Sequence, residues 1–236
     1  MPISNDYKIS IIIPAINEAD QLAKLITYLT SLPGTEHIAE IILSDGNSTD
    51  ETRTIASNLG ATVIVNEKSG RAIQMNNGAR QATGAILYFL HADSLPPRNF
   101  IEQIQHKVRN GFVAGCYRLH FDYRHWFLQL NAWFTRFNMN AFRFGDQSLF
   151  VTSRVFESIK GFREELIIME DQEIIYRIRK KGNFTVINDY VTTSARKYRL
   201  NGVYRMQAIF FYIYFSYLLG ASQESLVRKY KRLIKN

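Results

Sequence analysis

The chain has 236 residues, of which 46% are hydrophobic and 21% are charged. This composition is typical of a globular domain and excludes a disordered or low-complexity chain. Its single cysteine, Cys116, excludes an intramolecular disulfide and a zinc site built from cysteines. The first eight residues lack the basic and apolar blocks of a signal peptide. These features favour a reducing, cytoplasmic location.

The net charge of +8 is concentrated at the C-terminal end of the chain. Residues 194–236 hold nine Lys or Arg residues and a single acid, Glu224, whereas residues 1–193 carry equal numbers of both signs. A basic patch on the body of a domain would indicate nucleic-acid binding, but a basic tail on a neutral body does not. The charge therefore predicts a neutral domain over residues 1–193, a basic and aromatic extension over residues 194–236, and no nucleic-acid partner.

Short aliphatic runs alternate with amphipathic stretches over the first ninety residues. The runs predict buried strands and the stretches predict helices. The predicted strands are 9–13, 41–43, 61–65 and 85–90, and the predicted helices are 18–32, 49–59 and 71–82. This alternation is typical of a parallel sheet with right-handed crossovers, so the sequence predicts an α/β domain.

The alternation weakens after residue 93. Helices are predicted over 100–108 and 172–180, strands over 112–121, 149–151 and 184–187, and a helix with a loop over the aromatic stretch 126–144. There is no internal repeat and no linker composition. We therefore expect one mostly parallel central sheet that is flanked by helices.

Three polar clusters directly follow predicted strands, at residues 14–18, 45–50 and 91–93. Each cluster alone is explained by ordinary turn chemistry, since Asp, Asn, Gly and Ser are common in loops. In an open parallel sheet, however, ligands bind beyond the carboxyl ends of the strands. Three such clusters in succession favour one shared pocket.

The sequence contains neither of the common glycine-rich phosphate loops, G-x-G-x-x-G and G-x-x-x-x-G-K-[ST]. A bound diphosphate would then need a metal ion together with Arg or Lys side chains. Asp93 is the candidate ligand for such an ion, because Mg²⁺ and Mn²⁺ prefer carboxylate and phosphate oxygens. His91 is either a second ligand or a structural residue.

Several motifs, taken in order, resemble the signature of family 2 glycosyltransferases with the GT-A fold. They are Pro14-Ala15-x-Asn17-Glu18, Asp45-Gly46-x-Ser48-x-Asp50, His91-x-Asp93 and Glu170-Asp171, and the resemblance covers residues 8–190. Two further segments are similar to a bacterial subgroup of small, single-domain members, namely Gly70-Arg71-Ala72-x-Gln74-Met75-Asn76 and Gly145-Asp146-Gln147.

The resemblance implies a GT-A catalytic domain over residues 1–193 and a donor that is a UDP- or GDP-linked sugar. It implies that Asp171 is the general base with Glu170 beside it, and that Asp93, with His91 in place of the family's usual first Asp, holds Mn²⁺ or Mg²⁺. Arg196 would lie at the diphosphate, and Asp146 and Gln147 would face the acceptor. The implied nucleotide-sugar residues are Pro14, Ala15, Asn17, Glu18, Asp45, Arg71, Gln74 and Asp93.

The family's reaction inverts the anomeric carbon, which needs a stabilised leaving group and a base at the acceptor hydroxyl but no covalent intermediate. The alternative for Glu170-Asp171 is a helix N-terminus, where acids are favoured. A nucleotidyltransferase is a second hypothesis, although residues 14–18 offer no glycine-rich basic loop. A non-catalytic module that binds anionic lipid or nucleic acid through the tail is a third, but it leaves the acids without a role.

Residues 206–223 carry no charge, which meets the minimum length for a membrane span. Tyrosines at 204, 212, 214 and 217 favour an interface position over the hydrocarbon centre. A helix on the membrane surface and a helix buried on the body or in a dimer are therefore both preferred to a span. A membrane-facing tail would suit a lipid-linked acceptor and a peripheral location, whereas the segment 196–198 could instead point inward over the diphosphate.

Overall fold

We analysed a computed structural model that describes residues 7–143 and 145–234. The N-terminal residues 1–6, Phe144 and residues 235–236 lie outside the described part. The inference about a signal peptide, the last residue of the predicted 126–144 stretch and the charge of Lys235 therefore concern residues on which the structure gives no information.

The described strands form one sheet of eight, with the order β3-β2-β1-β4-β7-β6-β8-β5. Most neighbours run parallel, but β7 is antiparallel to both β4 and β6, and β5 is antiparallel to β8. The strands are β1 (Ile9–Ala15), β2 (Ile38–Asp45), β3 (Thr62–Val65), β4 (Ile86–Phe89), β5 (Ser94–Leu95), β6 (Phe112–Phe121), β7 (Leu149–Thr152) and β8 (Asn183–Thr193).

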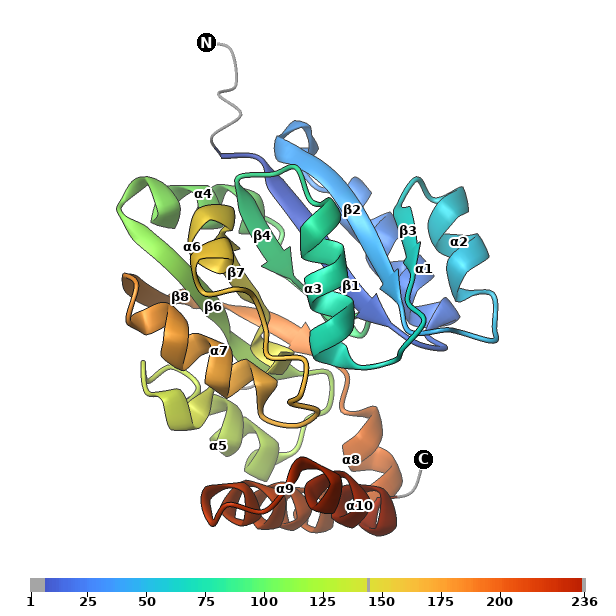
Figure 1. The fold of residues 1–236 in the computed structure, drawn as a ribbon, viewed down its shortest axis with the longest axis vertical. Helices are drawn as coiled ribbons and strands as arrows, with labels where there is room; N and C mark the ends of the chain where they lie inside the picture. The colour runs from blue at the N-terminus through green and yellow to red at the C-terminus, as the bar shows by residue number, and fades with distance from the viewer. Residues whose placement is uncertain (1–6, 144, 235–236) are drawn as a thin grey trace.

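Helices cover both faces of this sheet (Figure 1). Short 3₁₀ turns lie at Thr35–His37, Asn140–Phe142 and Gly145–Gln147. The helices are α1 (Ala19–Thr30), α2 (Thr52–Asn58), α3 (Arg71–Gln81), α4 (Phe100–Arg109), α5 (Trp126–Phe134), α6 (Ser153–Ser158), α7 (Glu170–Arg179), α8 (Arg196–Asn201), α9 (Val203–Leu218) and α10 (Gln223–Leu233).

The alternation of side chains along β1 divides the core into two layers. Ile11 and Ile13 are fully buried in a cluster with residues of α1 and α4, whereas Ile12 joins a second cluster with residues of α3, α6 and α7. Successive strand residues point to opposite faces, so a strand covered on both sides is apolar throughout. This explains why the run 9–13 has no polar face except Ser10.

The predicted α/β class is confirmed, and most element limits agree within three residues. The predicted strand 184–187 is too short, since β8 extends to Thr193. Its extension passes a register shift in which Ile187 pairs with Tyr117 and Tyr190 pairs with Arg118. The helix α6 and the two-residue strand β5 were not expected from the sequence.

The C-terminal extension folds as three helices at one end of the molecule (Figure 1). The uncharged stretch 206–223 is interrupted after α9, where Gly220 adopts a φ of +81° and Ser222 caps α10 by accepting a hydrogen bond from the Ser225 amide. No helix in the described residues is long and apolar enough to cross a membrane.

Candidate functional site

The loops after β1 and β2 are joined by hydrogen bonds. Asn17 has a left-handed φ of +53°, its amide donates to Ser48 Oγ (2.9 Å), and its Oδ1 accepts from the Thr49 amide (2.8 Å). The Glu18 amide donates to Thr52 Oγ1 (3.0 Å). The carboxyl ends of two neighbouring parallel strands are thereby held as one rim.

Asp45, at the end of β2, is fully buried. Its Oδ2 accepts hydrogen bonds from the amides of Asn47 (3.0 Å) and Ser48 (2.9 Å), its Oδ1 accepts one from the Ser48 hydroxyl, and Arg53 lies 3.7 Å away. The carboxylate thus organises its own loop, and the contact with base or ribose that the resemblance implies stays a prediction.

Gln74 on α3 is also buried, and its Nε2 donates to the carbonyls of Ala15 (2.9 Å) and Ser44 (2.8 Å). It therefore fixes the ends of β1 and β2 from beneath. Pro14 is half-buried and Ala15 is buried in β1. These three residues shape the backbone at this rim of the sheet.

Glu170 and Asp171 form the first turn of α7, so the helix-terminus interpretation of these acids holds alongside any other. Arg71 Nη1 lies 3.3 Å from Glu170 Oε1 and 3.9 Å from Asp171 Oδ2. Burial and the neighbouring carboxylate raise the pKa of Glu170 to about 7. Burial also raises the pKa of Asp171, against the lowering effect of Arg71. The two acids therefore compete for ionisation beside one guanidinium.

Gly145 brings His91 and Asp171 together. A Cβ at this position would collide with the Asp171 Oδ2 and lie 3.0 Å from His91 Cε1. His91, Gly145 and Asp171 line one small cleft, together with apolar side chains of α3, β4 and α7. Residues that are 54 and 26 positions from Gly145 in the sequence thus share one opening.

Asp146 follows in the same turn, with its Oδ1 3.3 Å from His91 Nδ1. Partial removal from water raises the pKa of Asp146, but the hydrogen bond from His91 and the positive charges of Arg71 and Lys197 outweigh this effect and lower it to about 2. Asp146 is therefore ionised and fixes which ring nitrogen of His91 carries a proton.

Asp93 lies at the edge of this cluster. Burial and the negative charge of Asp146 raise its pKa, whereas His91 and Lys197 act in the opposite direction. No described side chain donates a hydrogen bond to its carboxylate. Within residues 7–143 and 145–234, no group of three or more His, Cys, Asp or Glu side chains is placed to hold a metal ion.

The C-terminal extension reaches the first loop through one ion pair. Arg196 Nη2 lies 2.6 Å from Glu18 Oε1, and this hydrogen bond raises the pKa of the arginine. Glu18 Oε2 is buried and has no hydrogen-bond partner. The segment 196–198 therefore points toward the body, as one of the two expectations for it required.

Gln147 is buried, unlike Asp146 beside it. Its Oε1 accepts from Arg143 Nη1 (2.6 Å) and its Nε2 donates to the Phe142 carbonyl (2.6 Å). Arg143 is itself fully buried, forms no ion pair with an acid among the described residues, and also donates to the Thr135 carbonyl (2.6 Å). Gln147 thus holds its loop, and its expected contact with an acceptor remains untested.

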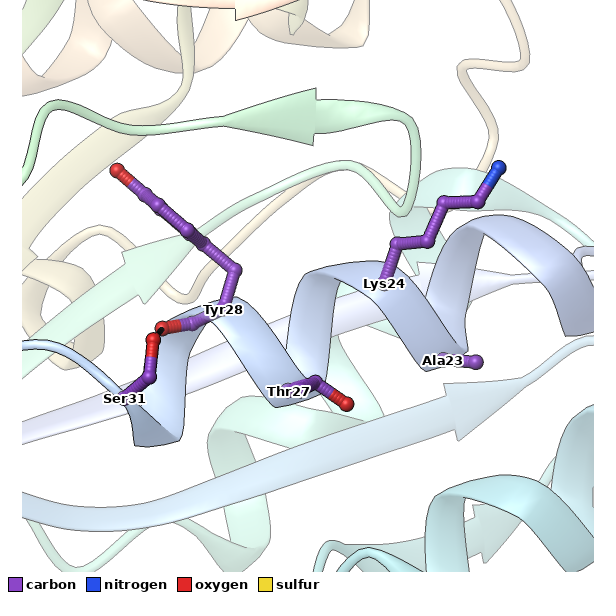
Figure 2. A pocket seen from close by; sticks show the side chains of 5 residues that line it. All are labelled: Ala23, Lys24, Thr27, Tyr28 and Ser31. Atoms are coloured by element: carbon purple, nitrogen blue, oxygen red, sulfur yellow. Dashed lines mark hydrogen bonds between the residues drawn. The ribbon is translucent and has the colours of Figure 1, made fainter.

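A second hollow lies on the surface of α1, lined by Ala23, Lys24, Thr27, Tyr28 and Ser31 (Figure 2). The Tyr28 hydroxyl donates to the Pro96 carbonyl (2.8 Å) and the Ser31 hydroxyl donates to its own helix. All of its lining residues come from one helix and its surrounding segment, and it contains no converging charges. The cleft at Gly145 is therefore the better candidate site.

The geometry adds three residues that motif analysis did not select as site residues. Gly145 was part of a motif, but its contact with Asp171 depends on the tertiary fold. Lys197 acts on both Asp93 and Asp146 through its charge. Gln223 holds the backbone immediately before α7. Gly145 and Lys197 had a signal in the sequence, through the motif and through the place beside Arg196, whereas Gln223 had none.

Comparison with other proteins identifies relatives of part of the chain. It is similar to glycosyltransferase AglE of Haloferax volcanii, with 32% identity over 101 residues, which cover 40% of this chain and 33% of AglE. It is also similar to the GalNAc(5)-diNAcBac-PP-undecaprenol beta-1,3-glucosyltransferase of Campylobacter jejuni, with 30% identity over 113 residues, 45% of this chain and 36% of that protein. The matched segments thus span about a third of each relative.

Two solved structures show the same fold at low sequence identity. The mannosyltransferase PcManGT from Pyrobaculum calidifontis, in complex with GDP-Man and Mn²⁺, gives a TM-score of 0.69 at 16% identity and covers 96% of this chain and 68% of its own. S. aureus TarS in complex with UDP-GlcNAc gives 0.65 at 17% identity, with coverage of 80% and 59%. The expected GT-A fold is thereby confirmed.

The family model described as "Glycosyl transferase family 2" matches residues 10–168, well over half of the chain. The match includes the polar loops after β1, β2 and β4 and the turn at Gly145. Together with the fold, it shows that the chain belongs to glycosyl transferase family 2 and is a glycosyltransferase enzyme.

Proposed function

We propose that this glycosyltransferase moves a sugar from a UDP- or GDP-linked donor to an acceptor hydroxyl with inversion, and that Asp171 is the general base. The observation that supports this most is the approach of Asp171 and His91 at Gly145. One group lies at a helix N-terminus and the other at the end of a central strand, so an acceptor hydroxyl at the mouth of this small cleft would lie near both. Membership of the family favours glycosyl transfer over both the nucleotidyltransferase hypothesis and the non-catalytic hypothesis.

The donor would lie along the rim formed by the loops after β1 and β2. In PcManGT and TarS the solved complexes contain GDP-Man and UDP-GlcNAc, which supports a nucleotide-sugar donor here. Arg196 and Lys197 supply positive charge beside Glu18 and Asp93, where the leaving diphosphate would accumulate negative charge. Asn17 and Glu18 would face the nucleoside.

The chemical step is a single displacement. The acceptor oxygen forms a bond to the anomeric carbon, the bond from that carbon to the diphosphate breaks, and the hydroxyl proton passes to Asp171. The raised pKa of Asp171 makes its carboxylate a stronger base, while Arg71 keeps it ionised. Asp146 would contact the acceptor from the opposite side of Gly145, with Gln147 shaping the loop.

A divalent ion, Mn²⁺ or Mg²⁺, suits the residues present when the substrate supplies most ligands. No described side chain donates a hydrogen bond to the carboxylate of Asp93, and such an ion is commonly bound by one or two carboxylates plus phosphate oxygens. Asp146 holds Nδ1 of His91, an arrangement that orients the other ring nitrogen of metal-binding histidines. Such an ion would stabilise the charge of the leaving diphosphate.

The acceptor is proposed to be attached to a lipid, with the enzyme peripheral on the cytoplasmic membrane face. Two relatives are named for undecaprenol-linked substrates, one of them an undecaprenyl-phosphate 4-deoxy-4-formamido-L-arabinose transferase. The aromatic and basic extension of residues 194–236 is consistent with this proposal, because cationic residues beside interfacial aromatics bind anionic membranes.

The decisive experiment is a thermal-shift series with UDP- and GDP-sugars, with and without Mn²⁺ or Mg²⁺. A donor at about 100 times its dissociation constant should add about 2.7 kcal/mol to stability, which for a chain of this length raises the Tm by several degrees. Asp93→Asn should remove the effect of the metal on donor binding. Asp171→Asn should keep donor binding and lower transfer by about a hundred- to ten-thousand-fold.

Asp20→Asn serves as the matched control, because Asp20 lies on the exposed side of α1. It should change neither donor binding nor transfer. Retention of full transfer in Asp171→Asn would exclude this residue as the base. If the donor raises the Tm of the wild-type protein equally with and without Mn²⁺ or Mg²⁺, a role of the metal ion in donor binding would be excluded.

A further inference from the structure

Large apolar side chains are exposed mainly in two segments of the described chain. One is α5 with the turn that follows it, and the other is α9 with the residue that follows it, Leu219. Together they hold more than half of the exposed large apolar residues: Trp126, Leu130, Trp133, Phe134, Phe137, Met139, Tyr204, Phe211, Tyr212, Phe215, Leu218 and Leu219. A concentration of this kind marks an interaction surface rather than scattered surface residues.

The exposed residues form a stripe on each helix. On α9, Tyr204, Phe211 and Phe215 are separated by seven and four residues, so they lie on one side of the helix. The opposite side of α9, with Ile209 and Ile213, is buried against α10 and the segment before α7. On α5, Leu130 is four residues after Trp126. Each helix thus has a core side and, within the described part of the chain, an exposed apolar side.

The two stripes meet. The ring of Tyr204 lies 6.4 Å from that of Trp126 and 5.2 Å from that of Phe127, although Tyr204 and Trp126 remain 56% and 63% exposed. In Figure 1, α5, α9 and α10 gather at one end of the molecule. We call this continuous surface, made by the exposed residues of α5 and α9, the aromatic face.

The two segments that make the aromatic face carry charge of one sign only. Residues 123–143 and 195–223 contain no Asp or Glu. Arg136 lies over the ring of Trp133 at 4.6 Å, and Lys229 of α10 lies over the ring of Tyr212 at 5.1 Å. Each helix therefore presents exposed aromatic rings next to a cation. This arrangement is complementary to a surface with an apolar interior and an anionic boundary.

We propose that the aromatic face is the surface by which the enzyme docks on an anionic lipid bilayer, with the side chains of α5 and α9 inserted at the boundary between the headgroups and the acyl chains. The contribution of α5 is new, because the sequence pointed only to the tail. The proposal specifies how the enzyme reaches the lipid-linked acceptor proposed above. It also stands without that acceptor, since docking needs no substrate.

Docking by this face would bring the candidate site close to the membrane. Helix α9 packs through Ile209 and Ile213 on Ile168 and Met169. These two residues immediately precede Glu170 and the proposed base Asp171 at the start of α7. The start of α7 would then be separated from the bilayer by α9 and the segment Ile168–Met169. Arg136 and Lys229 would meet the anionic headgroups.

The two tryptophans of the chain, Trp126 and Trp133, both lie in the aromatic face, so intrinsic fluorescence reports on it directly. The full-length protein is titrated with phosphatidylcholine vesicles that contain or lack phosphatidylglycerol. We expect a blue shift of tryptophan emission and cosedimentation with the anionic vesicles, and weaker effects with the neutral ones. Vesicles with brominated acyl chains should quench the emission, because the rings enter the apolar zone.

Phe215→Glu and Leu130→Glu should each weaken vesicle binding by about tenfold, because a charge replaces apolar area at the interface. Lys229→Gln should weaken binding to anionic vesicles only. Leu59→Glu, a similar change at an exposed site after α2, is the matched control and should bind as the wild type does. Donor-induced thermal shifts should persist in all four variants, so a failure of docking is distinct from a failure of the proposed reaction.

Two results would overturn the proposal. The first is tryptophan emission that stays unchanged with anionic vesicles. The second is a wild-type protein that does not bind vesicles but forms a concentration-dependent dimer in analytical ultracentrifugation, where Phe215→Glu is monomeric. The aromatic face would then bind a second copy of the chain.

Discussion

The side chain of Gln223 forms hydrogen bonds with the backbone of Ile167 and Ile168. Its Oε1 accepts hydrogen bonds from the amides of Ile167 and Ile168 (both 3.0 Å), and its Nε2 donates to the Ile168 carbonyl (3.2 Å). Met169 follows with a left-handed φ of +69°, and α7 begins at Glu170. The first turn of α10 thus fixes the chain just before the proposed base.

Gln223→Ala should therefore lower kcat more than it raises the KM for the donor. The loss of these hydrogen bonds should also reduce the free energy of unfolding by about 1–3 kcal/mol. Steady-state kinetics, together with urea unfolding, measures both effects. Gln81→Ala, at an exposed residue that ends α3, is the control and should change neither. A Gln223→Ala enzyme with normal kcat would show that this contact supports stability alone.

Gly145→Ala should inactivate the enzyme with little effect on donor affinity. The new Cβ would lie 2.9 Å from Asp171 Cγ and 3.0 Å from His91 Cε1, so the proposed base must move. A displacement of about 1 Å at a reacting group costs roughly a hundred-fold in rate. Initial rates and calorimetric titration with the nucleoside diphosphate separate the two effects.

Gly111→Ala is the comparison for Gly145→Ala. Its Cβ would meet nothing within 4 Å, but its φ of +82° makes the substitution unfavourable. It should lower stability without lowering kcat at temperatures well below the Tm. If both variants lost activity in proportion to their stability, the contact between Gly145 and Asp171 would have no special role.

The raised pKa of Glu170 predicts how stability depends on pH. A carboxyl whose pKa is about 7 in the folded state and 4.5 otherwise is easier to ionise in the unfolded chain. The free energy of unfolding should therefore fall as the pH rises from about 4.5 to about 7, and Glu170→Gln should make this fall shallower. Urea unfolding at several pH values measures it, with Glu157→Gln on the exposed side of α6 as the control.

The same substitution should leave the acidic limb of the kcat profile in place. Glu170 is mostly protonated below about pH 7, and the pKa of Asp171 is set by burial and by Arg71, His91 and Asp146. Because glutamine is uncharged, as protonated Glu170 is, the ionisation of Asp171 should change little. An acidic limb near pH 7 that is lost in Glu170→Gln would indicate that Glu170, and not Asp171, accepts the proton.

Arg196→Ala should raise the KM for the donor, by about tenfold, with a smaller effect on kcat. The substitution removes a cation and leaves the Glu18 carboxylate unpaired where a diphosphate would bind. Adding Glu18→Gln should recover part of the affinity, since the unpaired charge is then gone. Arg154→Ala, at an exposed site on α6, should leave the KM unchanged.

Much of the fold could be predicted because buried strands and helices leave periodic patterns. The strand from Phe112 to Phe121 agrees at both ends. The predicted strand ends at Ile187, and Asn188 and Asp189, which follow it, are residue types typical of a turn. In the structure these two residues lie in a register shift against β6, and β8 continues to Thr193. A bulge depends on the neighbouring strand, which local sequence does not reveal.

The site was predictable to the extent that it lies at strand ends. His91 and Asp93 follow the parallel strand β4, as the sheet argument predicts, and Asp146 and Asp171, which only the family resemblance had selected, lie near them. The buried state of Asp45 was not expected, because its hydrogen bonds form only when its loop closes. The hydrogen bond between Gln223 and Ile168 joins residues that are 55 positions apart in the sequence, so no local sequence pattern predicts it.

The buried guanidinium of Arg143 has a consequence for how substrates are received. Its hydrogen bonds to the Thr135 carbonyl and Gln147 Oε1 tie the two ends of the segment that leads to Asp146. Residues 135–143 and 145–147, held in this way, would lose little conformational entropy when a substrate binds. If Asp146 faces the acceptor as proposed, discrimination between acceptors would rest on shape rather than on a folding loop.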